Sequence, residues 1–134
     1  MSELEAGVVG VDSQLLTSFY VDVFGFELTE RLEFEAFGTV LKLRRGAARL
    51  KLFFPVPAAT DRVESEPWHA CAGWRYAALY LDTEAQLHAV VDAVSASAGR
   101  VLTAPMSHRS DATVALVSDP EGNVWELLWE RGGS

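Results

Sequence analysis

One stretch of the chain decides the fold: Asp119-Pro120-Glu121-Gly122-Asn123-Val124-Trp125-Glu126-Leu127, in which a turn runs directly into a strand. Proline fixes its own φ angle, and glycine and asparagine adopt left-handed backbone at low cost, so the first five residues are typical of a sharp turn. The alternation that follows predicts a strand with Val124, Glu126 and Leu128 on one face. Glu126 then lies among apolar neighbours, where a carboxylate normally requires a metal, a cation or a ligand as its partner. The alternative is an edge strand on which Glu126 is solvated.

The rest of the chain predicts the same order of elements twice: a strand, a helix and three strands. Strands are expected at residues 6–11, 26–34, 37–44, 48–54, 74–82, 100–103, 112–118 and 123–130. A linker with three prolines is expected at residues 55–73, and a polar loop at 104–111. Repetition over roughly half a chain is typical of two stacked modules. We therefore expect an α+β fold in which residues 1–134 form a single domain, with pseudo-symmetric βαβββ modules at 4–54 and 74–130 that stack their mixed sheets together.

Each module has one helix with a recognisable start and an apolar face. Asp12 or Ser13 caps the first helix and Gly25 ends it, while Thr83-x-x-Gln86 is a capping-box pattern that opens the second, which Gly99 ends. The expected apolar faces consist of Leu15, Leu16, Phe19 and Val23 in the first helix and Leu87, Val90, Val91 and Val94 in the second. The residues around Arg45-Gly46 mark a hairpin between the third and fourth strands.

The composition narrows the possible partners and the compartment. The formal net charge of −8 lacks the basic footprint of a nucleic-acid-binding protein and favours neutral or cationic partners. A single cysteine, Cys71, excludes an internal disulfide and suggests a reducing compartment. The N-terminus carries acids where a signal peptide has bases, and no apolar run reaches the ~18 residues of a membrane span. The cytoplasm is therefore the expected location.

Two segments of the chain resemble the vicinal oxygen chelate superfamily, which groups glyoxalase I, bleomycin-resistance proteins and extradiol dioxygenases. Residues 12–26 are similar to the first helix of that family with its Phe-Tyr and Gly-Phe pattern, and residues 119–127 are similar to its closing Asp-Pro-Asp-Gly-Asn turn and strand. The resemblance covers nearly the whole chain. It implies sheets that curve into a cup around a ligand, and it implies a homodimer, because many members are dimers.

Enzymes of this family hold a divalent metal with four cup-facing residues, usually His, Glu, His and Glu. By spacing, the resemblance carries these positions onto Glu5, Lys51, Tyr76 and Glu126, of which Glu126 alone matches. An ammonium has no lone pair for a metal, and a phenol is a poor ligand near neutral pH. We therefore expect no metal or other cofactor, with Lys51 neutralising Glu126 and Glu5. The alternatives are a divalent metal at Glu5 and Glu126, or a drifted site whose Lys51 extends to water.

The expected cup also has an aromatic surface and a polar loop. Trp74, Tyr76 and Tyr80 share one face of the fifth strand, and Phe53 lies beside Lys51 on the fourth. With Glu5 and Glu126, such a pocket suits a flat molecule that is apolar or weakly basic. His108 belongs to the loop that could close over this ligand, but neither it nor the two remaining histidines, His69 and His88, lies on a strand at ligand spacing. The alternative is that the rings only fill the core.

Three hypotheses for function remain open. The first is a metal-independent protein that binds a small organic molecule, in the manner of bleomycin-resistance proteins. The second is a lyase, isomerase or dioxygenase in which Glu5, Tyr76 and Glu126 act around a metal or as acid and base. The third is an interaction module that has kept the fold and lost the site. No nucleic-acid or membrane partner is expected.

Overall fold

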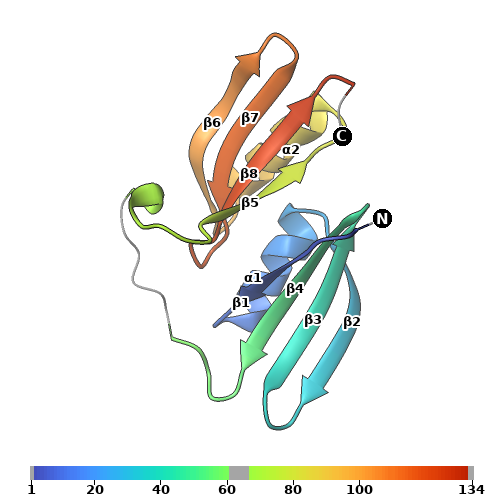
Figure 1. Cartoon of the computed structure of the whole chain (residues 1–134), viewed down its shortest axis with the longest axis vertical. Coiled ribbons are helices and arrows are strands. Elements are labelled where there is room, and N and C mark those ends of the chain that lie inside the picture. The colour runs from blue at the N-terminus through green and yellow to red at the C-terminus, as the bar shows by residue number, and fades with distance from the viewer. Residues whose placement is uncertain (1, 61–66, 133–134) are drawn as a thin grey trace. The chain divides into compact units, whose positions relative to one another are not determined.

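The computed structural model of the chain describes residues 2–60 and 67–132. The chain divides into two compact units, Met1–Arg62 and Val63–Ser134, called here the first and the second unit (Figure 1). Each unit contains a strand, a helix and three further strands, so the expected α+β fold with a repeated order of elements is confirmed. Among the residues that the structure describes, no helix is long and apolar enough to cross a membrane.

The first unit is built on a four-stranded sheet in the order β1-β4-β3-β2. Its strands are β1 (Glu5–Val9), β2 (Glu27–Phe34), β3 (Gly38–Arg45) and β4 (Ala48–Pro55). β1 runs parallel to β4, and the other two pairings are antiparallel. Arg45 pairs with Ala48 across a two-residue turn in which Gly46 has a φ of 57°, so the predicted hairpin is present.

One face of this sheet forms the core of the first unit together with the helical segment. The helix α1 (Ser13–Ser18) continues into a π-helical turn, Phe19–Val23. The Asp12 carboxylate accepts a hydrogen bond from the Leu15 backbone N–H at 3.0 Å, which satisfies one orphan donor at the start of the helix. Buried core side chains come from the helical segment (Leu16, Phe19, Tyr20, Phe24) and from the sheet (Leu41, Leu43, Leu50, Leu52). The opposite face of the sheet remains open.

The second unit repeats this architecture with the strand order β5-β8-β7-β6. Its elements are β5 (Tyr76–Tyr80), α2 (Glu84–Ser95), β6 (Arg100–Arg109), β7 (Ala112–Ser118) and β8 (Val124–Glu130), preceded by a 3-10 turn at Trp68–Ala70. The Thr83 side chain accepts from the Gln86 N–H, and the Gln86 side chain accepts from the Asp82 N–H, both at 3.1 Å. The predicted cap is therefore present, and all four predicted core residues of α2 are buried, namely Leu87, Val90, Val91 and Val94.

The turn that precedes β8 is held by the carboxylate of Asp119. This side chain is 2% exposed and accepts hydrogen bonds from the backbone N–H groups of Glu121 and Asn123, each at 2.9 Å, and from the Asn123 amide at 2.8 Å. Gly122 supplies a φ of 88° that other residues adopt only with strain. The predicted turn is thus confirmed, and its central anchor is the aspartate.

Two expectations about strand limits and one about the position of a strand in its sheet were wrong. β6 extends to Arg109, so most of the expected loop at 104–111 is strand and contains His108. Pro105 suggested a break, but β6 is an edge strand and its pairing with β7 is irregular between Thr103 and Met106, where a residue without N–H is tolerated. β5 begins at Tyr76, which leaves Trp74 outside the strand. β8 lies between β5 and β7, so the edge-strand interpretation of Glu126 is also wrong.

Candidate functional site

The open face of the first unit carries three of the predicted site residues. Along β4, Leu50 and Leu52 are fully buried, whereas the Lys51 side chain between them is 44% exposed. Phe53 follows Lys51 on the same face, because side chains two apart in a strand point the same way. Glu5 reaches Lys51 from β1. The predicted orientation of β4 is therefore right, and a one-residue slip would have buried the lysine instead.

A groove of about 530 Å³ lies on this open face. It is lined by Gly7, Val8, Val9, Phe34, Phe37, Val40, Lys51 and Phe53. Strand register explains how they meet, since Phe53 pairs with Val40 of β3 and with Val9 of β1, while Lys51 pairs with Gly7. The glycine is important for the shape: a Cβ placed on Gly7 would meet no atom within 4 Å, so the missing side chain leaves space beside Lys51.

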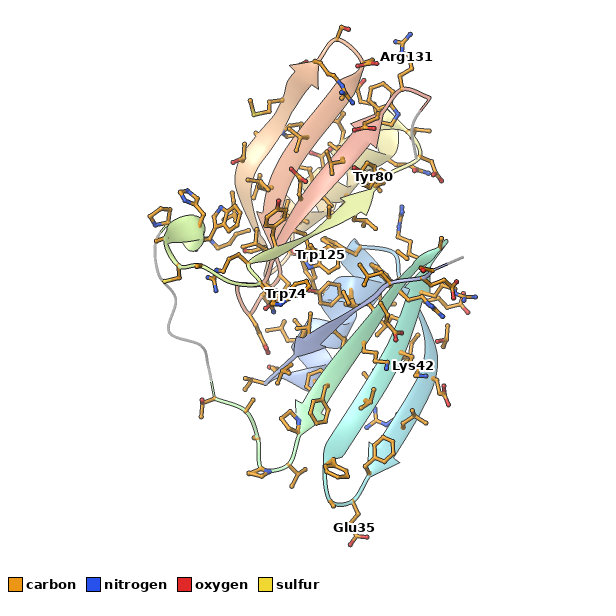
Figure 2. All side chains as sticks on the ribbon, in the orientation of Figure 1. Glu35, Lys42, Trp74, Tyr80, Trp125 and Arg131 are labelled. Atoms are coloured by element: carbon orange, nitrogen blue, oxygen red, sulfur yellow. The ribbon has the colours of Figure 1, made fainter. Side chains whose placement is uncertain are left out.

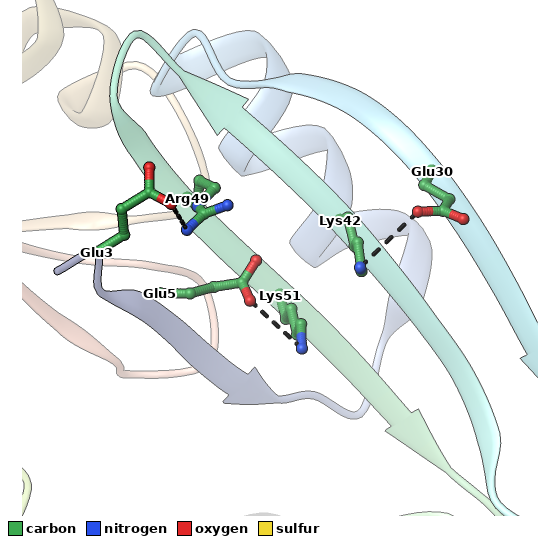
Figure 3. A network of polar contacts seen from close by, with 6 residues as sticks. All are labelled: Glu3, Glu5, Glu30, Lys42, Arg49 and Lys51. Carbon is green, nitrogen blue, oxygen red and sulfur yellow. Dashed lines mark hydrogen bonds and ion pairs between the residues drawn. The ribbon is translucent and has the colours of Figure 1, made fainter. Parts of the chain in front are cut away.

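Three ion pairs cross the open face at one end of the groove (Figure 3). The Lys51 ammonium lies 3.3 Å from a Glu5 carboxylate oxygen, Lys42 lies 3.8 Å from Glu30, and Arg49 lies 2.9 Å from Glu3. Partly exposed pairs of this kind contribute little to stability. Their effect is to place three cations and three carboxylates at defined positions beside an apolar groove.

The second unit carries the other predicted residues on its own open face. Glu126 of β8 pairs with Ala78 of β5, and the register places Tyr76 and Tyr80 as its diagonal neighbours. Both tyrosines are about half exposed, at 55% and 48%, and Glu126 is half-buried. The residue that pairs with Glu126 is the small Ala78, whose side chain is a single methyl group. A carboxylate and two phenols on one surface can accept and donate hydrogen bonds to a ligand.

The 3-10 turn of the second unit supports this face in a way that the sequence did not reveal. The Trp68 ring packs edge-on against Tyr76 with 5.6 Å between ring centroids, and the Arg75 guanidinium donates hydrogen bonds to the Trp68 carbonyl at 3.2 and 3.3 Å. Trp68 was assigned to the linker because prolines and charges surround it. Only the packing of the folded chain identifies it as a neighbour of the site.

Two predicted site residues are not placed in either cluster. Trp74 is 96% exposed in a bend before β5, whereas Tyr80 lies at the end of that strand (Figure 2). The expectation that Trp74 shares a strand face with Tyr76 is therefore wrong, because the strand begins two residues later. The side chain of His108 lies outside the described residues. The predicted contact between Lys51 and Glu126 would join the two units, and it stays a prediction.

The residues present do not fit the four-ligand metal site that the family's enzymes use. Among the side chains that the structure describes, no group of three or more His, Cys, Asp or Glu residues could hold a metal ion. The position expected to supply the second ligand is Lys51, whose ammonium has no lone pair and contacts Glu5 instead.

Sequence reasoning found Lys51 and Phe53 but missed the remaining groove residues. Val9 and Val40 share the face of Phe53, a relation that follows from strand register and not from periodicity within one strand. Phe34 ends β2 and Phe37 lies in the turn before β3, with exposed fractions of 46% and 66%. Two exposed phenylalanines around a tight turn were the available signal, since large apolar side chains gathered on a surface mark binding sites.

Comparison with known proteins places the chain in a family. Residues 6–127 match the model of the Glyoxalase/Bleomycin resistance protein/Dioxygenase superfamily. A search of the curated proteins gave no match. Among solved structures, the chain is similar to a glyoxalase family protein from Bacillus cereus, with a TM-score of 0.78, 14% identity and coverage of 97% of this chain and 95% of the other.

Two further solved structures show the same fold. Lactoylglutathione lyase from Agrobacterium tumefaciens has a TM-score of 0.66 and 23% identity, with coverage of 96% of this chain and 92% of the other. TioX from Micromonospora sp. ML1 has a TM-score of 0.65 and 18% identity, with coverage of 99% and 97%. The family model spans nearly the whole chain, and the repeated β-α-β-β-β order agrees with it. This chain therefore belongs to the glyoxalase/bleomycin resistance protein/dioxygenase superfamily.

Proposed function

We propose that this protein binds a small organic molecule in the groove of the first unit, without a metal ion. The groove itself carries the proposal. Its volume of about 530 Å³ lies in the range of roughly 300–1,000 Å³ that is typical of ligand pockets, and its lining is mainly phenyl and aliphatic. A ligand with an apolar body would remove these exposed side chains from water, which is the main favourable term in such binding.

We propose binding without a metal because of the chemistry of Lys51. Its ammonium occupies the position that supplies a carboxylate ligand in the family's enzymes, and it already contacts Glu5. A divalent cation placed there would meet a like charge and would lose one oxygen ligand. Binding and sequestration of an organic molecule require neither a metal nor a catalytic group.

A neutral fluorescent probe, N-phenyl-1-naphthylamine, tests groove binding directly. We expect one probe per chain, with emission that rises as the probe leaves water. Gly7→Leu should abolish binding, because the new side chain enters the groove while no atom lies within 4 Å of the added Cβ. Phe53→Ala should weaken binding by about 1–3 kcal/mol, as expected when an aromatic contact is lost.

The control for Phe53→Ala is Phe54→Ala on the same strand. Phe54 points to the opposite face, where its ring lies near Gly10, and it has a similar half-buried environment. Its truncation should leave probe affinity unchanged. Equal loss of affinity in both variants, or probe binding that survives Gly7→Leu, would place the probe elsewhere and contradict the proposal.

A second candidate function is an enzyme of the lyase, isomerase or dioxygenase type. The observation that favours it is the half-buried Glu126 between Tyr76 and Tyr80, and one solved structure of the same fold bears the name lactoylglutathione lyase. In that case Glu126 would act as a base, or with Glu5 as a metal ligand. Elemental analysis separates the two candidates: one equivalent of divalent metal in the purified protein would move the enzyme ahead of the binding protein.

We also expect the protein to form a homodimer. In the sheet of the first unit β1 is an edge strand, and its residues Gly7 and Val9 are exposed. Unpaired edges favour association with another chain, and closed two-fold dimers are the commonest solution. Light scattering at micromolar concentration should give twice the chain mass, and a stable monomer mass would rule out the dimer.

A further inference from the structure

The groove has one charged side chain among the described residues that line it, and this is the cation Lys51. Its ammonium carries three N–H donors. One contact is to Glu5 at 3.3 Å, and the Lys51 side chain keeps 44% of its surface exposed. Glu5 itself is not part of the lining. The charged side chain that lines the groove is therefore a cation, although the chain as a whole carries a net charge of −8.

A second cation stands directly beside the first. Lys42 pairs in register with Lys51 across β3 and β4, so both side chains are on the open face (Figure 3). Like charges directly opposite each other on adjacent strands are destabilising. Each lysine has its carboxylate, Glu5 or Glu30, on the next strand outward and not between the two ammonium groups. An anion placed between them would reduce this repulsion.

On the open face, the residues that point into or beside the groove change from charged or small to apolar within two positions along β4, β3 and β1. Two residues beyond Lys51 on β4 lies Phe53, two residues before Lys42 on β3 lies Val40, and two residues beyond Gly7 on β1 lies Val9. The direction is the same in space, because Phe53 pairs with both valines. Two residues span about 7 Å of strand. The groove thus has a cationic end and an aromatic end separated by about the length of a ring.

We infer that the ligand is an organic acid, with a carboxylate that contacts Lys51 and a ring or alkyl body that lies on Phe53 and its neighbours. The inference rests on the proposed function, since it specifies the chemical class of the ligand in the same groove. It departs from the apolar or weakly basic ligand expected from the sequence, because the one charged side chain in the described lining of the groove is the cation Lys51.

Displacement of the neutral probe by matched ligands tests the charge preference. The three competitors share one ring system: 2-naphthoate, 2-naphthamide and 2-naphthylmethylammonium. We expect the carboxylate to bind about fivefold more tightly than the amide, the upper end for one partly exposed charge pair, and the ammonium compound to bind least. The advantage of the carboxylate should shrink as salt is added, while probe affinity should not fall.

Lys51→Met should remove the preference for 2-naphthoate over 2-naphthamide. The matched control is Arg49→Met, because Arg49 is a cation of the same strand that pairs with Glu3 and is not part of the lining. Glu5→Gln provides a change in the opposite direction: it removes the competing carboxylate and should tighten binding of 2-naphthoate.

The outcomes separate the inference from the function on which it rests. Failure of the probe to bind the unmodified protein would overturn both. Probe binding with equal affinities for 2-naphthoate and 2-naphthamide would leave the proposed function standing and overturn the inference. A carboxylate preference that persists in Lys51→Met, or that Glu5→Gln weakens, would also overturn it.

Discussion

Replacing Gly38 by alanine should destabilise the protein by about 3 kcal/mol or more, because two penalties combine at this residue. Gly38 has a φ of 125°, a region that side chains with a Cβ rarely adopt. A Cβ at this position would also overlap the backbone carbonyl of Phe54 on the adjacent strand, which cannot rotate away. Backbone pairing holds the two strands at this short distance. Gly38 pairs with Pro55, and the Phe37 carbonyl accepts a hydrogen bond from the Val56 N–H at 2.7 Å.

Gly46→Ala is the matched control for this substitution. Gly46 also has positive φ, 57°, and lies in the turn at the other end of β3, but a Cβ there meets no atom within 4 Å. Its replacement should cost only the ~1–2 kcal/mol of left-handed backbone. Urea unfolding followed by circular dichroism measures both variants. Equal midpoints would mean that the overlap with Phe54 is relieved by a small backbone shift.

The Gly38→Ala variant also connects stability to the site. Gly38 immediately follows Phe37 and lies two residues before Val40, and both of these line the groove. A shift of β3 away from β4 would open the groove at its aromatic end. We therefore expect the variant to lose probe binding at temperatures at which its far-ultraviolet spectrum is still that of the folded protein.

The sequence predicted those parts of the fold in which local chemistry and burial agree. The four core residues of α2 repeat with helical spacing, and Thr83 and Gln86 form the cap of this helix. The sequence alone predicts both the buried face and the cap. The alternation along β4 likewise gave the correct face to Lys51 and Phe53. In each case the side chain that satisfies the backbone or the core lies within a few residues in the chain, so a local pattern suffices.

The limits of β5 and β6 could not be predicted, because they depend on pairing partners. A proline interrupts most strands, but Pro105 lies on the edge strand β6 where the pairing with β7 is irregular, and there a residue without N–H is tolerated. Trp74 continues the alternation of Tyr76 and Tyr80 in sequence, although the pairing of β5 with β8 begins at Tyr76. An aromatic alternation therefore predicts a strand face only as far as the partner strand reaches.

For the candidate site too, the sequence predicts single residues but not the strand pairing that brings them together. Glu5, Lys51 and Phe53 were predicted individually, whereas the groove needs the register that pairs Gly7 with Lys51 and Val40 with Phe53. The sign of the charge in the groove also depends on this register. Net charge averages over the whole surface, but a ligand responds to the few side chains within a Debye length of about 8–10 Å. Composition alone therefore gives no information on the side chains that a ligand in this groove would contact. The displacement experiment distinguishes the acid that we infer from the weakly basic molecule that net charge favours.

Replacing Asp119 by alanine should destabilise the protein by about 3 kcal/mol, even though the residue touches neither groove nor open face in our proposal. Its buried carboxylate accepts hydrogen bonds from three N–H groups of the turn that leads into β8, and alanine would leave these donors without that acceptor. Bonds to a charged acceptor contribute more than neutral ones, and donors buried without a partner carry the full cost of lost hydration.

Two further substitutions show whether the hydrogen bonds of Asp119 are the cause. Asp12→Ala removes a carboxylate that accepts one N–H at an exposed helix start, so it should cost only about 1 kcal/mol. Asp119→Asn keeps one oxygen for the backbone N–H groups of Glu121 and Asn123 but presents an N–H₂ group to the Asn123 amide, so its stability should lie between the native protein and Asp119→Ala. Because this turn aims the strand that carries Glu126, amide exchange in β8 should quicken in the same order as the loss of stability. If Asp119→Ala were no less stable than Asp12→Ala, the carboxylate of Asp119 would contribute no more than a single exposed helix cap, and the prediction that it holds the turn and directs the strand would be wrong.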